Sequence, residues 1–503
     1  MRKNIFWLMG ILLWILLAIP SLYSISTGAI PFWYDPARDM LSAWGNLTKL
    51  TLIGPTSGIP GFFYGPYWIW LLSFSLLISK DPRFTSFVAA FVPYMILFPI
   101  VLYQFRRYFP KDILLILWAL FILGFKFYSI FIWNPYISLL LFLLSIYLVL
   151  SWISQVETSK SLKRIFLAGI IAGLALNVNM SFGSVFILSL IIFFVLSSIF
   201  LINASFRTKL KAFLLRFASF LAGTILTFLP FLIFELRHGF VQTKIALKAL
   251  VSGGGIIGIS GMSKAEIVKS FFTRWAQLLQ LPFNLSLIIL AILVVLLVLL
   301  LLKKKISFSL FHKSLILLII SIAISCFALY LSVKNPIWDY HFIGVEVIWI
   351  LLLGIFLTKI PFAKFFAYCW IAILIAISII VFLKNIDTPN PTANSLAAKE
   401  KIAKIIINDA GDKNYSVYAY NPSIYSYDYF YLSKWLAKKD VSYDPGLTKR
   451  EGYVYLILPA EKKALIEDFI NYRTPSKLYR TIRSWNMPDK TLVLKRIVTL
   501  SEN

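Results

Sequence analysis

Long apolar runs separated by short polar loops fill residues 1–384. Each run has roughly twenty residues, the length that an α-helix needs to cross the hydrocarbon core of a bilayer. The pattern predicts about eleven membrane spans, at 4–24, 84–105, 112–131, 135–154, 164–180, 182–202, 212–234, 283–302, 313–333, 341–358 and 362–383. The chain is therefore expected to be an α-helical, polytopic membrane protein.

Segment 64–79 is a further apolar run, but it is short, rich in Trp and Tyr, and begins next to glycine and proline. The positions of Lys and Arg decide its topology. If 64–79 does not cross and the N-terminus is cytoplasmic, the basic loops share the cytoplasmic side. The opposite turns at 133–135 and 177–179 then contain no Lys or Arg. The positive-inside rule thus predicts an interfacial or re-entrant helix on the outer face, within the first outer loop.

The composition changes after residue 384. Apolar content falls and charge rises over 385–503, beginning with a Pro-containing linker at 388–391. The pattern predicts helices at 395–409 and near 461–471, and strands at 415–420, 453–458 and 491–498. The sequence therefore predicts two domains, a membrane domain at 1–384 and a small extracytoplasmic α/β domain at 385–503.

The overall composition excludes a soluble protein, because 59% of the residues are hydrophobic and 17% are aromatic. The net charge of +27 does not indicate nucleic acid as a partner, since most Lys and Arg lie in short loops between apolar runs. We expect part of this charge to attract the phosphates of membrane lipids. Cys326 and Cys369 both lie in apolar runs, so no disulfide framework is expected.

The polar stretch after the first span reads FWYDPARD, at 32–39. Acidic residues at the membrane boundary are costly and are rarely incidental. Asp35 and Asp39 are four residues apart, so a short helix beginning at Pro36 would turn both carboxylates to one side. Such a carboxylate could take a proton from a hydroxyl group. Two other roles stay open, Asp35 as the N-cap of that helix and Asp39 as the ion-pair partner of Arg38.

Basic residues at two places on the same face could hold a phosphate. Arg237 and His238 follow the seventh span, where the alternative is an anchor at the headgroup level. Glu235 beside them could pair with them or bind a divalent metal. Lys126 is expected inside the third span, about 8 Å from its outer end at 1.5 Å per residue. A lysine there should face a polar cavity or a phosphate, unless its stem reaches the surface.

A third polar cluster, with Asp339, Tyr340 and His341, precedes the tenth span. Its alternative role is that of an interfacial aromatic belt with a solvated acid. The sequence contains no Cys/His cluster with zinc spacing, no phosphate-binding loop, no Rossmann glycine pattern and no G-x-S-x-G on a strand-to-helix turn. This argues against nucleotide hydrolysis and leaves room for a donor that is activated beforehand on a lipid.

These features resemble the GT-C superfamily of multi-span glycosyltransferases, which includes protein O-mannosyltransferases and the aminoarabinose transferase of lipid A. The chain is most similar to the bacterial branch of dolichyl-phosphate-mannose-protein mannosyltransferase-like proteins. The resemblance rests on motifs that run in order through the membrane part: WYDPARD at 33–39, LIGPTS at 52–57, GFFYGP at 61–66, WNP at 133–135 and PFLIFELRHGF at 230–240.

The resemblance implies an inverting transfer from an undecaprenyl- or dolichyl-phosphate sugar, with no nucleotide at the site. It assigns the catalytic base to an acid of the first outer loop, here Asp35. The family often has a second acid directly after the first, where this chain has Pro36, so Asp39 is the alternative second acid. Arg38 would shape the site. Related chains often carry a histidine where Tyr64 stands, so this ring needs a different role.

We therefore expect a plasma-membrane glycosyltransferase that moves a hexosyl or pentosyl group from a polyprenyl-phosphate carrier to an acceptor hydroxyl on a lipid, glycan or protein. The alternatives are a surface-polysaccharide polymerase or ligase, and a lipid or solute transporter. Asp35 and Asp39 are the expected catalytic residues. The expected substrate-binding residues are Arg38, Tyr64, Lys126, Asn134, Arg237, His238, Tyr340 and His341. A divalent metal stays open, with Glu235 as the candidate ligand.

Overall fold

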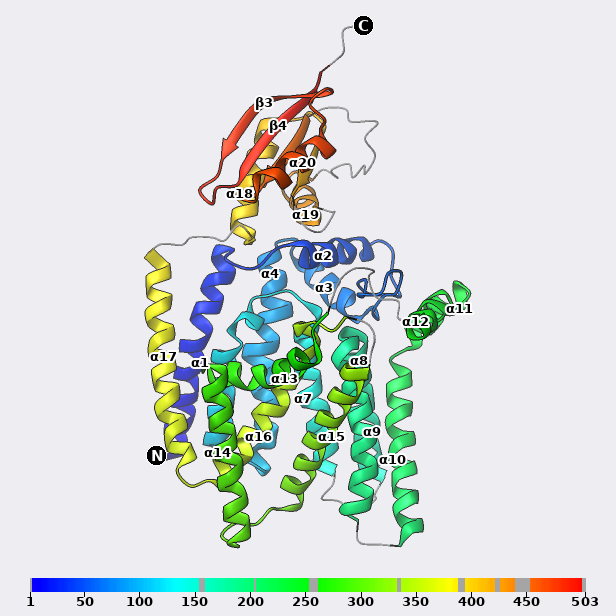
Figure 1. The fold of residues 1–503 in the computed structure, drawn as a ribbon, viewed down its shortest axis with the longest axis vertical. Helices are drawn as coiled ribbons and strands as arrows, with labels where there is room; N and C mark the ends of the chain where they lie inside the picture. Colours follow the sequence, from blue (N-terminus) through cyan, green and yellow to red (C-terminus); the bar gives the residue numbers. More distant parts are fainter. Residues whose placement is uncertain are drawn as a thin grey trace.

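The computed structural model describes residues 2–152, 159–202, 205–252, 261–332, 336–387, 394–420, 426–438 and 453–499. In this part of the chain, long helices form a bundle, and a small domain with a sheet stands at one end of it (Figure 1). We call this end the domain side. The N-terminal end of α1 (Arg2–Thr27) lies at the opposite end of the bundle. The expected linker at 388–391 lies outside the described residues.

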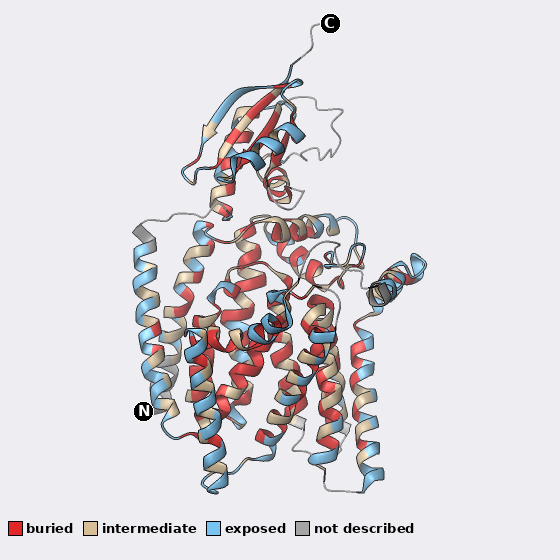
Figure 2. Cartoon of the chain, in the orientation of Figure 1, coloured by how far each residue is buried: buried red, intermediate tan, exposed pale blue. Residues whose placement is uncertain are grey.

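Apolar helices of membrane-spanning length make up most of the bundle, which confirms the predicted fold class. Among the described residues, eight helical stretches are long and apolar enough to cross a membrane, or nine if α10 and α11, which meet at a bend of 57°, form one span. They are α1, the stretch Pro82–Arg107 with α4 (Pro82–Ser86) and α5 (Phe98–Tyr103), α7 (Asn134–Trp152), α8 (Ser159–Val178), α9 (Met180–Phe200), α10 (Phe206–Leu226) with α11 (Leu229–Arg237), α14 (Phe283–Leu302), α15 (Leu310–Ser332) and α17 (Ala363–Asp387). Much of the surface of α10, α14 and α17 is exposed (Figure 2), as expected for helices that face lipid.

The expected number of about eleven spans is not confirmed. Two of the expected spans are shorter helices, α6 (Lys111–Gly124) with 14 residues and α16 (Val345–Lys359) with 15. At 1.5 Å per residue they reach about 21 and 23 Å, less than the roughly 30 Å of the hydrocarbon core. Most of their side chains are buried. Their apolarity therefore reflects packing against protein, which an apolar run alone does not distinguish from contact with lipid.

The expected interfacial helix of the first loop is present on the domain side. α3 (Tyr67–Ile78) has 12 residues, too few to cross a bilayer. It packs against α2 (Tyr34–Asn46), which lies between α3 and the small domain (Figure 1). These two helices place the polar motif of the first loop at the boundary between the bundle and the domain.

The chain between α2 and α3 folds into a hairpin at 54–64, which we call the first-loop hairpin. The Gly54 N–H donates to the Tyr64 carbonyl at 2.8 Å, and the Tyr64 N–H donates to the Pro55 carbonyl at 2.9 Å. Gly65 then packs so closely on Asn177 that a Cβ would lie 2.0 Å from its Oδ1. A glycine is required at this position, and it fixes the hairpin against α8.

Two helices complete the loop after α11. α12 (Val241–Ser252) turns back from α11, and α13 (Lys264–Leu279) runs across the bundle and contacts α6 and α16 (Figure 1). A capping box forms the start of α13. The Glu266 N–H donates to Ser263 Oγ at 3.3 Å, and the Ser263 N–H donates to Glu266 Oε2 at 2.7 Å.

The C-terminal domain has the α/β composition that the sequence predicts. Its elements are α18 (Leu396–Ala410), β1 (Tyr415–Ala419), α19 (Tyr427–Leu436), β2 (Tyr453–Leu458), α20 (Lys463–Arg473), β3 (Tyr479–Asn486) and β4 (Leu492–Val498). The strand order is β1-β2-β4-β3, with β1 and β2 parallel and the other pairs antiparallel. The sequence pattern does not predict β3, because most of its side chains are exposed, nor the short, Tyr-rich α19.

Helix α19 attaches the C-terminal domain to α2. The buried Tyr431 ring makes edge contacts with Phe32 and Trp44, with ring centres 5.7 and 5.6 Å apart. Its hydroxyl donates to the Lys80 carbonyl at 2.6 Å, across 351 positions of the sequence. Because these ring contacts are buried, they stabilise the attachment of the domain in the same way that aromatic contacts stabilise a hydrophobic core.

We expect Tyr431→Ala to loosen this attachment. Removal of a buried aromatic side chain costs about 3–5 kcal/mol, so the unfolding temperature of the purified protein should fall and a protease should release the C-terminal domain faster. Tyr472→Ala on α20, where the side chain is 64% exposed, is the control and should change neither quantity. Equal effects of both substitutions would contradict the role of Tyr431.

Candidate active site

Arg38 lies between two carboxylates on α2. Its Nη1 is 3.0 Å from Asp35 Oδ1, its Nη2 is 2.7 Å from Asp39 Oδ1, and its Nε donates to the same Asp39 oxygen at 2.8 Å. Both carboxylates therefore lie on one side of the helix, as their spacing predicts. The alternative that Asp35 is the N-cap is wrong, because Trp33 occupies that position. Asp35 lies in the first turn, where a carboxylate interacts favourably with the helix dipole.

Asp39 is the buried member of this pair. Its side chain is 1% exposed, and its Oδ2 accepts the indole N–H of Trp68 at 2.9 Å. Burial raises the pKa of Asp39 to about 6, while the charge of Arg38 opposes the rise. At neutral pH the carboxylate is therefore ionised. It holds Arg38 and has little surface left for a substrate.

Asp35 is the accessible carboxylate, with 35% of its side chain exposed. Arg38 links it to the first-loop hairpin, since its Nη1 also donates to Thr56 Oγ1 at 3.2 Å. Tyr64 and Tyr340 both lie close enough to interact electrostatically with Asp35. Burial raises the pKa of both phenols, so they are neutral hydroxyl groups near Asp35.

A second charged cluster, which the sequence analysis misses, lies around Arg274 of α13. Its Nη2 donates to the carboxylate of Asp339 at 2.7 Å and to the backbone carbonyl of the same residue at 2.6 Å. Its Nη1 donates to Gln277 Oε1 at 3.1 Å. Its Nε lies 3.6 Å from Oε1 of the buried Glu346, which also accepts the Tyr128 hydroxyl at 3.0 Å. The arginine is buried, and both of its terminal nitrogens donate hydrogen bonds, whereas its Nε makes none with the described residues.

This cluster borders a cavity of about 300 Å³ with largely aromatic walls. Its lining residues are Gly124, Phe125, Phe127, Tyr128, Trp133, Tyr136, Arg274, Gln277, Asp339, Tyr340 and Ile343. Tyr340 thus belongs to this cavity and to the neighbourhood of Asp35, and it connects the two. A signal for Arg274 exists in the sequence, since it lies on the same helical face as Ile267, Phe271 and Leu278. A charge on such an apolar face indicates a buried polar partner.

Lys126 does not lie inside a span, contrary to the expectation. α6 ends at Gly124, and Lys126 begins a short 3-10 helix, Lys126–Ser129. Its exposed side chain lines two further cavities of about 540 and 600 Å³. The first lies between α6 and α13, and the second between α1 and α17. The two share Leu123 and Phe127, and the first shares Gly124 and Phe127 with the aromatic cavity. Phe127 therefore lines all three cavities, and they are neighbours.

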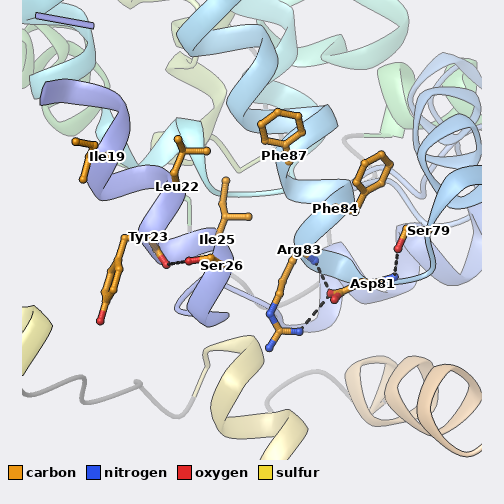
Figure 3. Close-up of a pocket in the computed structure, with 10 residues that line it drawn as sticks. All are labelled: Ile19, Leu22, Tyr23, Ile25, Ser26, Ser79, Asp81, Arg83, Phe84 and Phe87. Carbon is orange, nitrogen blue, oxygen red and sulfur yellow. Dashed lines mark hydrogen bonds and ion pairs between the residues drawn. The ribbon is translucent and has the colours of Figure 1, made fainter. Parts of the chain in front are cut away.

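A groove of about 620 Å³ lies between α1 and α4 (Figure 3). Arg83 stands at its edge and forms ion pairs with Asp81 at 3.3 Å and with Glu400 of α18 at 2.6 Å. Because two carboxylates hold this arginine, the groove offers mainly an apolar wall. The apolar side chains that line it are Ile19, Leu22, Ile25, Phe84 and Phe87.

Two of the expected phosphate-binding residues lie apart from Asp35. Arg237 and His238 are exposed at the end of α11, which stands at the edge of the molecule (Figure 1). The Nδ1 of His238 lies 2.8 Å from the Phe234 carbonyl. Within the described ranges, no hydrogen bond or ion pair joins either residue to the motif at 32–39. The structure does not bring these residues together with the candidate base.

Three further expected residues make structural contacts. Glu235 accepts the backbone N–H groups of residues 242 and 243, one on each carboxylate oxygen. Asn134 donates to the Val178 carbonyl at 2.6 Å. His341 accepts the Trp338 N–H at 3.1 Å, and burial lowers its pKa to about 4, so it is neutral at pH 7. In the described part of the chain, no group of three or more His, Cys, Asp or Glu side chains converges as a metal site would require.

The bundle, the short helices of the first loop and the small α/β domain together form a fold that is also found in solved structures of other proteins. Two crystal structures of ArnT from Cupriavidus metallidurans match the chain with a TM-score of 0.57, over 96% of this chain and 97% of theirs. One is bound to undecaprenyl phosphate and is 10% identical in sequence, and the other is in the apo state and is 11% identical.

The oligosaccharyltransferase of Archaeoglobus fulgidus, in a complex with Zn and sulfate, matches with a TM-score of 0.46 and 14% identity, over 96% of this chain and 75% of that one. No protein-family model matches the sequence, and no curated protein matches it. At such identities the likeness shows the fold, and the chemistry must be argued from the residues of this chain.

The raised pKa of Asp39 predicts a pH dependence of stability. Its value of about 6 in the folded protein lies above the value of about 4 in an unfolded chain. The contribution of Asp39 to stability is therefore most favourable below about pH 4 and is lost as the pH rises through about 6, by at most about 3 kcal/mol. Asp39→Asn removes this titration, so the difference in unfolding free energy between wild type and variant should change across that range. A difference that stays constant with pH would contradict the shift.

Proposed function

We propose that the protein is a GT-C glycosyltransferase that moves a sugar from a polyprenyl-phosphate carrier to an acceptor hydroxyl. The observation that carries the proposal is the accessible carboxylate of Asp35, held by Arg38 at 3.0 Å and within electrostatic reach of two neutral phenols. The GT-C fold supports it, and so does the undecaprenyl phosphate bound to one of the similar ArnT structures.

Asp35 acts as the general base in this proposal. It accepts the proton of the acceptor hydroxyl while that oxygen forms a bond to C1 of the sugar. The bond between C1 and the phosphate oxygen breaks, and its electron pair leaves with the phosphate. Attack on the face opposite the phosphate inverts the configuration at C1. Arg38 orients Asp35, and Asp39 is a positioning residue that acts through Arg38.

Lys126 is the cation that we assign to the donor phosphate. Its side chain is exposed at the junction of two cavities, and a lysine there can contact a phosphate without the burial of an unpaired charge. The larger cavity, between α1 and α17, has apolar walls that suit a polyprenyl chain. The aromatic cavity beside Tyr340 suits a sugar, since such sites combine apolar walls with a few polar groups. Arg237 and His238 do not line these cavities, so Lys126 replaces them in this role.

We place the reaction at the outer face of the plasma membrane. Lys303, Lys304 and Lys305 follow α14, and Lys359 ends α16, at the end of the bundle opposite the domain side (Figure 1). The positive-inside rule assigns that end to the cytoplasm. The N-terminus is then cytoplasmic, and the C-terminal domain with the candidate site is extracytoplasmic.

Asp35→Asn tests the base. Purified protein in nanodiscs is offered a panel of polyprenyl-monophosphate sugars with lipid, glycan and peptide acceptors. Loss of a general base should lower the transfer rate by about 10²- to 10⁴-fold with the unfolding temperature unchanged. Asp81→Asn, another acid on the domain side, is the control and should keep the activity. Full activity of folded Asp35→Asn would contradict the assignment of Asp35 as the general base. Transfer from diphosphate-linked oligosaccharides alone would favour a polymerase or ligase over the proposed transferase.

Lys126→Gln tests the position of the donor phosphate. A charge-assisted hydrogen bond contributes about 1.5–3 kcal/mol, so the KM for the donor should rise by about ten- to a hundredfold while the KM for the acceptor stays the same. Lys269→Gln, at an exposed position of α13, is the control for loss of a positive charge. An unchanged donor KM in Lys126→Gln would place the phosphate elsewhere.

A further inference from the structure

Helices α11 and α12 form a hairpin that stands out sideways from the domain-side end of α10 (Figure 1). α11 leaves α10 at a bend of 57°, so it does not continue the span in a straight line. Gly239 and Phe240, with φ of 64° and 60°, form the turn between the two helices. The carboxylate of Glu235 closes the turn by accepting two backbone N–H groups of α12. The hairpin is thus a defined structural unit.

The hairpin exposes a row of large apolar side chains. On α11, Leu232 and Leu236 are 46% and 62% exposed, and on α12 Leu247 is 57% exposed. This surface continues the exposed apolar surface of α10, where Ile225 and Leu226 are 56% and 46% exposed. A lipid phase that covers this surface of α10 would also cover the hairpin.

Basic side chains are exposed on the same two helices. Arg237, Lys244 and Lys248 are exposed, whereas Glu235, the one acidic residue between 229 and 252, is buried in the turn. A helix pair with an apolar face and a basic edge has the character of an interfacial element that lies on anionic phospholipids. The charge favours a lipid surface over a protein partner, which would need matching acids.

The hairpin is also connected to the candidate active site. Gln242 Oε1 accepts the backbone N–H of Phe63 at 2.9 Å. The rings of Phe62 and Phe231 lie 6.4 Å apart, edge to face. The next residue in the first-loop hairpin is Tyr64, which interacts with Asp35. The position of the α11–α12 hairpin relative to the membrane therefore bears on the position of Tyr64.

We propose that the α11–α12 hairpin is a membrane-surface anchor for anionic phospholipids on the domain side. Its apolar face lies in that leaflet, and Arg237, Lys244 and Lys248 contact the phosphate groups. Gln242 holds the first-loop hairpin to the anchor. This inference goes beyond the proposed function and does not rest on it, because it concerns where the hairpin lies and not which reaction follows.

Spin labels test the location of the hairpin. Leu236→Cys and Leu247→Cys are labelled one at a time in a Cys326→Ala, Cys369→Ser background, in nanodiscs of phosphatidylcholine and phosphatidylglycerol. We expect several-fold higher collision rates with oxygen, and lower rates with a water-soluble nickel chelate, than for a label at Leu465→Cys on α20. Accessibilities equal to those at Leu465 would overturn the proposal. Dipolar broadening from a second label, which would show another copy on this surface, would also overturn it.

The basic edge is tested by Arg237→Gln, Lys244→Gln and Lys248→Gln combined. Each basic residue near an anionic surface changes partitioning about fivefold. With the native charges, phosphatidylglycerol should increase the oxygen-to-nickel ratio at Leu236, and the triple variant should lose this increase. Lys463→Gln on α20 is the control for loss of charge. A triple variant that keeps the full response would overturn the headgroup contact.

The link to the first loop is tested at Gly58, where a Cβ meets no neighbour within 4 Å. A label at Gly58→Cys should become more mobile when Gln242→Leu removes the acceptor of the Phe63 N–H. The label at Leu236 should stay shielded from water in the same variant. Unchanged mobility at Gly58 would show that the anchor does not hold the first-loop hairpin.

Discussion

The guanidinium of Arg38 is the group on which the candidate site depends. Two carboxylates four residues apart on one helix repel each other, and one of them is almost fully buried. Arg38 lets both stay charged, because it contacts both at 3.0 Å or less. Removal of one partner of a buried ion pair costs about 3–5 kcal/mol, since it leaves an uncompensated charge. The buried acid and the arginine therefore hold the more accessible acid, Asp35, in its position.

This ionic core is supported from two sides. On the bundle side, the indole of Trp68 on α3 donates to Asp39. On the domain side, Arg38 lies 5.5 Å above the ring centre of Tyr34, and that ring contacts Tyr427 of α19 at 5.0 Å. The C-terminal domain therefore packs on the helix that carries the motif. Through this contact the small α/β domain stabilises a candidate site that is formed by the membrane domain.

The fold could be predicted largely from the sequence, because the strongest signals are local. Runs of apolar residues identify the long helices, Ser263 and Glu266 identify the start of α13, and short runs rich in Tyr, Val, Leu and Ile identify β1, β2 and β4. The short helices α6 and α16 are predicted as membrane spans, because helices that are buried by protein and helices that face lipid both consist of apolar side chains. The sequence pattern does not predict β3, because most side chains of this edge strand are exposed and it has no apolar face.

The candidate site was predictable only where its parts are neighbours in the sequence. The motif at 32–39 carries its own charges, and the ion pairs follow from its spacing. The cluster around Arg274 depends on Asp339 and Glu346, which come from other elements. Pairing across 65 positions, as between Arg274 and Asp339, leaves no local pattern. Arg237 and His238 are the opposite case, because the sequence assigns them to the site and the structure does not. A basic pair at a helix end has the same sequence pattern whether it faces a substrate or the membrane surface.

The attachment of the C-terminal domain also joins two segments that lie on either side of the bundle in the sequence. The Leu396 N–H donates to the Ile30 carbonyl at 2.9 Å, and the Phe32 N–H donates to the Asn394 carbonyl at 2.9 Å. During synthesis the segment around Phe32 leaves the ribosome before the rest of the bundle, and its partners leave it after the bundle. Every helix of the bundle must be inserted before α18 and α19 can cover α2. The nascent chain therefore carries its charged motif uncovered until α18 and α19, which follow the whole bundle in the sequence, have been translated.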